Sequence, residues 1–214
     1  MTNHNISSRN LFDDTEETPH QRSFERLEMP DADVIFYRKF FTEAQSDAFY
    51  AELYSNTSWK QEKIKLYGKL IELPRLTAWY GDEGRSYKYS GITVTANPWI
   101  PVLLEIKKEI EAVSGVIFNS VLLNLYRGER DSVAWHSDDE PELGRDPIIG
   151  SVSFGATRSF QFKHKEKALR QKIDLPHGSY LLMRGSTQHF WLHQVPKETK
   201  PCGERINLTF RVIK

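Results

Sequence analysis

The chain has 214 residues, with 29 basic and 29 acidic side chains and a single cysteine, Cys202. This length suffices for one domain with a buried core and an added arm. One cysteine excludes a disulfide framework, and no apolar run in the sequence is long enough to span a bilayer. We therefore expect a monomer of the cytoplasm, or of the nucleus if the source is eukaryotic, with neither export nor membrane insertion.

The N-terminal region differs from the rest of the chain in charge. Residues 1–33 carry eight acidic side chains against three arginines, a net charge of −5, so the remaining residues carry +5. The opening is polar and lacks the apolar content needed to offset its ordering entropy. We expect residues 1–30 to be an acidic, mobile tail without an assigned role, and residues 31–214 to form a single domain. The mildly basic body permits an anionic partner but does not require one.

Two segments have helical patterns. In residues 41–57, Thr42 is placed to cap a helix, with Gln45 three positions later as in a capping box. Residues 100–115 have a continuous apolar stripe at helical spacing. This stripe consists of Val102, Leu103, Ile106, Ile110 and Val113.

After residue 118 the hydrophobic pattern changes to period two, which is typical of strands. Several short strands that follow helices indicate a mainly β, α+β fold: a double-stranded β-helix, or jelly-roll barrel, over about 118–214, buttressed by N-terminal helices. Residues of about 60–95 are predicted to form hairpins and loops outside this barrel. The predicted barrel strands are 119–126, 148–154, 159–165, 179–183 and 205–213.

A possible metal site follows the first of these strands. His136 and Asp138 are two residues apart, so in an extended segment their side chains point the same way. The stretch "TQHFWLHQVP" offers His189 and His193 as a third ligand. Two histidines and one carboxylate are the ligand set of non-haem Fe(II) oxygenases, which leaves three coordination positions open. The alternative is an acidic turn in water, because an H-x-D pair alone is weak evidence.

The last predicted strand has two different faces. Its apolar face belongs to a core, whereas the opposite face carries two arginines, which are rarely buried without an anionic partner. Either this face lines a site for an anion, or the strand lies at an edge with its polar face in water. In the same way, Asn124 and Tyr126 share a face with Leu122. The polar face of the last strand consists of Arg205, Asn207, Thr209 and Arg211.

These segments together resemble the AlkB-type 2-oxoglutarate- and Fe(II)-dependent dioxygenases. The resemblance runs from about Leu66 to the C-terminus and includes "NLYRGERDSVAWHSDDEPELG", "IIGSVSFGATRSFQFKHK" and "RINLTFR". So many ordered matches are more specific than any one motif. The likeness is greatest to the animal nucleic-acid demethylases of the family, rather than to its protein- or lipid-directed members.

The resemblance implies a role for particular residues. The iron ligands and catalytic centre would be His136, Asp138 and His193. The 2-oxoglutarate pocket would consist of Asn124, Tyr126, Arg205, Asn207 and Arg211, with Arg205 on the distal carboxylate. The flipped-out base would be held by Arg75, Tyr87, Tyr89 and Glu140, and Tyr67 matches the position of the apolar wedge in the duplex-acting relative.

The resemblance also implies a reaction. Iron, O2 and 2-oxoglutarate would oxidise the methyl group of bases such as 1-methyladenine and 3-methylcytosine in DNA, with RNA as a further substrate, and release formaldehyde. A methyl group on a ring nitrogen blocks base pairing, which makes such a base cheap to extrude. The choice between single strand and duplex stays open. Two alternatives remain: an oxygenase acting on a small molecule or a protein, and a jelly-roll metal-binding module without activity.

Overall fold

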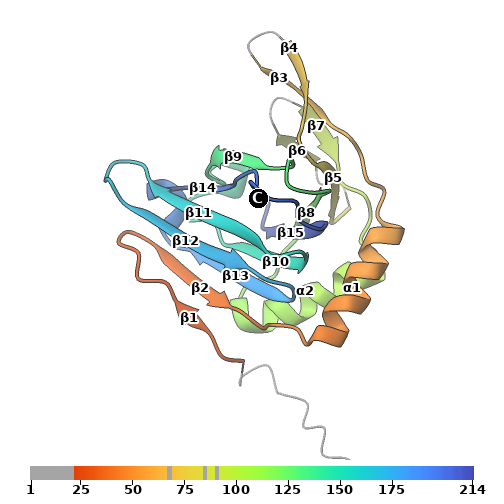
Figure 1. Cartoon of the computed structure of the whole chain (residues 1–214), viewed down its shortest axis with the longest axis horizontal. Helices are drawn as coiled ribbons and strands as arrows, with labels where there is room; N and C mark the ends of the chain where they lie inside the picture. The colour runs from red at the N-terminus through yellow and green to blue at the C-terminus, as the bar shows by residue number, and fades with distance from the viewer. Residues whose placement is uncertain (1–21, 67–68, 84–85, 90–91) are drawn as a thin grey trace, which may run out of the picture.

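The computed structural model describes residues 22–66, 69–83, 86–89 and 92–214. Its larger sheet has seven antiparallel strands in the order β1-β2-β13-β10-β15-β8-β5 (Figure 1). β15 is an interior strand of this sheet and pairs with β10 and β8. The strands are β1 (Glu25–Arg26), β2 (Asp33–Tyr37), β5 (Leu76–Gly81), β8 (Ser120–Tyr126), β10 (Ile149–Gly155), β13 (Ser179–Arg184) and β15 (Arg205–Arg211).

A second sheet of four strands, in the order β12-β11-β14-β9, forms the other wall of the barrel. Aromatic side chains from both sheets pack between the two walls, among them Phe36 from the larger sheet and Phe162 and Trp191 from the smaller one. This arrangement confirms the expected jelly roll. The strands are β9 (Val133–His136), β11 (Arg158–His164), β12 (Arg170–Leu175) and β14 (Trp191–Val195).

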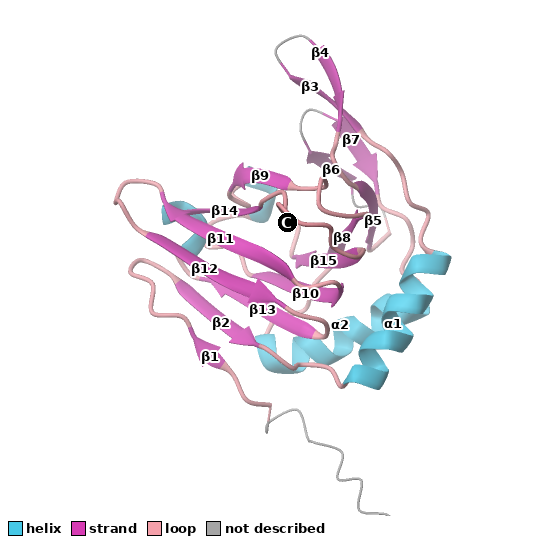
Figure 2. Cartoon of the chain, in the orientation of Figure 1, coloured by secondary structure: helices cyan, strands magenta, loops and turns pink. Residues whose placement is uncertain are grey.

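Helices cover the outer face of the larger sheet (Figure 2). α1 (Glu43–Asn56) begins with the predicted capping box, in which the Gln45 amide donates to Thr42 Oγ1 and the Thr42 amide donates to the Gln45 side chain. α2 (Pro101–Ser114) ends at Gly115, whose φ of 67° is one that glycine adopts without strain. Both predicted helices are therefore confirmed. Two short helices, η2 (Pro141–Leu143) and α3 (Thr187–Phe190), lie in loops of the barrel.

The region predicted to form outer hairpins is only partly outside the barrel. β3 (Lys63–Leu66) pairs with β4 (Lys69–Glu72), and β6 (Ser86–Tyr89) pairs with β7 (Ile92–Thr95), as two separate hairpins (Figure 1). β5, between them, is instead an edge strand of the larger sheet and is buried over most of its length. Because Thr77, Ala78, Trp79 and Tyr80 are all buried, this strand has no period-two alternation by which the sequence could reveal it.

Part of the segment expected to be a mobile tail has a defined structure. Residues 22–30, assigned to the mobile tail, include β1, and the side chains of Leu27 and Met29 are buried in the core. Residues 22–30 contain few apolar side chains, so their composition gave no sign that Leu27 and Met29 are buried. Residues 1–21, the rest of the predicted tail, lie outside the described residues. Within the described part of the chain, none of the helices combines the length and apolar character needed to cross a membrane.

The central position of β15 leads to a prediction about stability. Leu208 is fully buried in this strand, so Leu208→Ala should lower the free energy of unfolding by about 2–5 kcal/mol through lost burial and a cavity. Leu104→Ala is the control, because Leu104 on α2 is exposed and its loss should change stability by about 0.5 kcal/mol or less. Urea unfolding measures both values, and similar losses would contradict this account of the core.

Candidate active site

Three metal-ligand side chains converge at one end of the barrel. His136 is the last residue of β9 and pairs directly with His193 on β14, which places their rings 4.2 Å apart. Asp138 follows in the next loop and turns its carboxylate to the same point. One ligand atom from each residue lies within 4.8 Å of the others, which is close enough for a shared ion. The structure thus brings together the three residues that the resemblance singled out.

The charge states of these groups suit a divalent cation. Burial would raise the pKa of Asp138, but Arg211, His193 and His136 lower it to about 2. Burial and the neighbouring His136 lower the pKa of His193 to about 3. At neutral pH the carboxylate is therefore ionised and the imidazole neutral, as metal ligands must be. Arg211 donates to Asp138 Oδ1 at 2.6 Å, and Oδ2 faces His193.

Neighbouring groups orient each ligand. His136 Nδ1 lies 2.8 Å from the Ala134 carbonyl, which can only accept, so Nδ1 carries the proton and Nε2 keeps a lone pair for a metal. The Asp138 amide donates to Gln188 Oε1 at 3.0 Å. The Phe160 ring stacks on the His193 ring, with 5.3 Å between their centres. The ligand rotamers are therefore set by the protein.

His189, the other histidine considered as a ligand, lies elsewhere. It sits on α3, where its Nε2 is 2.8 Å from Asp146 Oδ1, and its side chain is 40% exposed. The structure therefore supports His193 as the third member of the cluster. The register follows from strand pairing, since β14 carries His193 opposite His136, whereas His189 precedes the strand.

The pocket beside the cluster is lined by polar groups of the larger sheet. Asn124 and Tyr126 on β8 and Asn207, Thr209 and Arg211 on β15 share this pocket with the three metal-ligand residues. The polar face of β15 therefore points into the barrel, and Ile206, Leu208 and Phe210 pack in the core on its other side, as predicted. The alternative of an edge strand in water is wrong.

Arg205 differs from the other buried arginines of this region. Its guanidinium carbon lies 5.0 Å from the centre of the Tyr126 ring, and its Nη2 donates to Ser153 Oγ. Its Nε and Nη1 are buried and have no hydrogen-bond partner among the described residues. Unpaired buried donors on a cation are costly, so this arrangement favours an anion as the missing partner. Arg205 does not itself line the pocket, but Tyr126, which it contacts, does.

Among the predicted base-binding residues, the structure describes the side chains of Arg75 and Glu140. Arg75 lies in the pocket beside the expected 2-oxoglutarate residues, where its Nε donates to Asn124 Oδ1 at 2.7 Å. Glu140 caps η2, and its buried Oε2 has no partner within the described part of the protein. Tyr87 and Tyr89 are on β6, but their side chains, like the whole of Tyr67, lie outside the described residues. Their roles stay predictions.

Some residues of the site escaped the sequence argument. Ser151 on β10 lines the pocket and accepts from the Asn207 side chain, and Ser153 holds Arg205. Their alternation with Val152 and Phe154 was a usable signal, because small polar residues at every second position mark an inward polar face. Gln188, which is fully buried, had no such signal because it lies in a single helical turn.

The chain belongs to the 2OG-Fe(II) oxygenase superfamily, whose family model matches residues 33–211. The match begins well before Leu66, where the resemblance of the motifs starts. Relatives named as alkB homologs place the chain among the AlkB-type members of this superfamily. The ligand set and the buried guanidinium described above fit the metal and the dicarboxylate in the family's name.

Three relatives illustrate the similarity. The alpha-ketoglutarate-dependent dioxygenase alkB homolog 3 of Bos taurus is 49% identical over 79% of this chain and 62% of its own length. The human protein of that name is 46% identical over 84% of this chain and 66% of its own length. The human DNA oxidative demethylase ALKBH2 is 38% identical over 83% and 72%. The chain thus spans less than two thirds of the first two relatives.

A solved structure agrees on the fold. The structure of OsALKBH1 superposes with a TM-score of 0.60, covering 89% of this chain and all of that one. Its sequence identity is 18%, so it supports the jelly-roll architecture alone.

The geometry of the three ligands leads to a test. His136→Ala and His193→Ala should each abolish stoichiometric binding of Fe(II) or of Co(II) as its stable substitute, because two ligands rarely hold such an ion. His189→Ala is the matched control and should bind normally, since it only breaks a surface contact with Asp146. Metal content after anaerobic loading measures all three. Loss of metal in His189→Ala but not in His193→Ala would overturn this assignment.

Proposed function

We propose that this protein is an Fe(II)- and 2-oxoglutarate-dependent dioxygenase that removes methyl groups from alkylated DNA bases such as 1-methyladenine and 3-methylcytosine. The proposal extends to RNA carrying the same lesions. The observation that carries it is one pocket in which the His136–Asp138–His193 cluster lies beside buried polar groups suited to a dicarboxylate. The printed names of two relatives, a dioxygenase and a DNA oxidative demethylase, support the reaction and the substrate class.

Two groups of polar residues are proposed to bind the two ends of 2-oxoglutarate. Near the metal ligands, Arg211 keeps Asp138 ionised and adds positive charge. Farther along β15, Arg205 offers two unpaired donors to the distal carboxylate, and Tyr126 and Asn124 add neutral hydrogen-bonding groups. Bound iron would supply the oxidant by reducing O2 as 2-oxoglutarate is converted to succinate and CO2. The hydroxylated methyl group then leaves as formaldehyde.

The proposed substrate is a cationic base, and Glu140 is suited to it. A ring-methylated adenine or cytosine carries positive charge and can no longer pair, which lowers the cost of extruding it. Glu140 Oε2 is buried without a hydrogen-bond partner among the described residues, so a cationic base with an exocyclic amine would satisfy it. Tyr67, Tyr87 and Tyr89 are proposed to contact the nucleic acid, Tyr67 as a wedge in the base stack.

The function is tested with short oligonucleotides that each carry one lesion, as single strands and as duplexes, in DNA and in RNA. We expect equimolar formaldehyde and succinate, and mass spectrometry should show the loss of one methyl group from 1-methyladenine and 3-methylcytosine. Asp138→Ala should be inactive on every substrate. Succinate formation without any demethylation of these oligonucleotides would instead favour a small molecule or a protein as the substrate.

The role of Arg205 has its own test. Lysine cannot reproduce the planar fork with which arginine grips a carboxylate. Losing a charged hydrogen bond costs about 1.5–3 kcal/mol, so Arg205→Lys should raise the 2-oxoglutarate KM roughly 10- to 100-fold and leave oligonucleotide affinity nearly unchanged. Arg184→Lys, which alters a half-exposed pair with Asp33, is the control. An unchanged 2-oxoglutarate KM in Arg205→Lys would move the anion site elsewhere.

A further inference from the structure

The strand that carries His136 has little support from its own sheet. β9 is the edge strand of the four-stranded sheet, so β14 is its single neighbour there. The two strands pair in register at His193 with His136 and at Val195 with Val133, with an irregularity between these pairs. Pro196 follows directly and has no N–H to continue the ladder. Outside the sheet, the Ser132 amide donates to the Pro74 carbonyl and the Glu198 amide to the Glu129 carbonyl, both at 2.9 Å, whereas the Asp131 carbonyl accepts from a side chain.

Arg158, the first residue of β11, supplies that donor. Its Nη2 donates to the carbonyl of Asp131 at 2.9 Å and to the carbonyl of Pro196 at 2.6 Å. Asp131 precedes β9 and Pro196 follows β14, so one nitrogen joins the two chain segments just beyond their last pair. Nη1 donates to the Gly128 carbonyl at 3.2 Å. The Arg158 side chain is fully buried, which makes these bonds costly to leave unmade.

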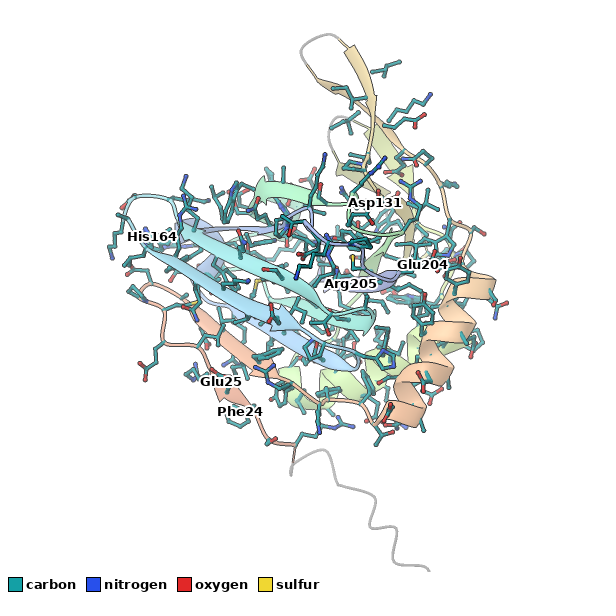
Figure 3. The ribbon with its side chains drawn as sticks, viewed as in Figure 1. Phe24, Glu25, Asp131, His164, Glu204 and Arg205 are labelled. Carbon is teal, nitrogen blue, oxygen red and sulfur yellow. The ribbon has the colours of Figure 1, made fainter. Side chains whose placement is uncertain are left out.

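The Arg158 guanidinium also lies near Tyr126, one of the residues expected to bind 2-oxoglutarate. Its carbon lies 5.5 Å from the centre of the Tyr126 ring, the ring that Arg205 also contacts. The loop that contains Gly128 and Asp131 is also held by Arg127. Arg127 donates to the Asp131 carboxylate through its main-chain amide and its side chain. Figure 3 labels Asp131 and Arg205 at the end of the barrel that bears the hairpins. Arg158 has its donors occupied by protein, whereas Arg205 keeps two donors open.

We propose that Arg158 is a positioning residue of the active site: it clamps the start of β9 to the end of β14 and braces Tyr126, and so sets the distance between His136 and His193. Arg158 touches neither metal nor cosubstrate in this account. The identities of the ion, iron, and of the dicarboxylate, 2-oxoglutarate, rest on the proposed function. The positioning role of Arg158 rests on its contacts within the chain.

The test measures metal binding without any oligonucleotide, so it does not depend on the nature of the substrate. Arg158→Gln removes the charge and the guanidinium that makes the three carbonyl contacts, and Arg158→Lys keeps the charge without the fork. Residues that orient metal ligands typically change affinity by 10–100-fold. We expect Co(II) titration of the anaerobic full-length protein to show binding weakened about 10–100-fold in Arg158→Gln and by an intermediate factor in Arg158→Lys.

Two control variants separate positioning from loss of fold. Arg22→Lys alters another largely buried arginine, paired with Glu109 on α2 far from the cluster, and should leave Co(II) affinity unchanged even if the melting temperature falls. Glu198→Gln removes the acidic partner of Arg158 but leaves the carbonyl contacts, and it should also bind Co(II) normally. Circular dichroism confirms that each variant is folded at the temperature of the titration.

A second measurement, of 2-oxoglutarate affinity, tests whether the contact of Arg158 with Tyr126 positions that ring. In the Co(II)-loaded protein, 2-oxoglutarate affinity measured by calorimetry should fall in Arg158→Gln and recover in part in Arg158→Lys. Wild-type affinity for both Co(II) and 2-oxoglutarate in a folded Arg158→Gln protein would overturn the proposal. Equal weakening of Co(II) binding in Arg22→Lys would do the same, because the effect would then follow general stability. Failure to demethylate any oligonucleotide would affect the proposed function alone.

Discussion

The candidate site depends first on the buried ion pair between Arg211 and Asp138. The bond joins the last residue of the central strand β15 to the loop that follows β9, and both side chains are almost fully covered. Removing one partner of a buried ion pair lowers the free energy of unfolding by about 3–5 kcal/mol, because the other charge stays buried without compensation. The pair also keeps the carboxylate ionised, and it occupies one oxygen while the other faces His193. One interaction thus sets the position and the charge of Asp138 and leaves one of its oxygens facing the candidate metal site.

Most of the barrel and much of the site could be predicted because they obey simple periodicities. The two faces of β15 follow from strict alternation, whereas the burial of its arginines depends on the smaller sheet, which covers the polar face. The helices follow from the capping box and the apolar stripe. The H-x-D pair and the arginine-bearing strand each had an ordinary explanation alone, and the resemblance of many ordered motifs to one family implied their roles.

What could not be predicted depends on contacts between distant segments. β9 and β14 are short, and the pairing that places His193 opposite His136 is invisible in either segment alone, so the sequence could favour His193 over His189 only through the resemblance. β5 reads as part of a loop region because its paired residues on β8 lie 39 to 49 positions away in the sequence, from Gly81 with Ser120 to Leu76 with Leu125. Arg158 lies in an unremarkable strand, and its three carbonyl partners come from two different loops. Main-chain acceptors have no signature in a sequence, so a clamp of this kind requires the fold.

The short segment before β2 has a consequence for how the protein is handled. Residues 22–31 lie along the outer edge of the larger sheet, where Leu27 and Met29 are buried and the Pro30 carbonyl accepts from the Trp191 ring nitrogen. The family model begins only at residue 33, so it leaves this segment out. A chain trimmed to that boundary would bare the backbone of β2 together with the apolar hollows that Leu27 and Met29 fill. An open strand edge beside apolar surface is a template for pairing with other chains. The segment therefore protects this edge of the sheet, and trimming it would expose a strand that can pair with other chains.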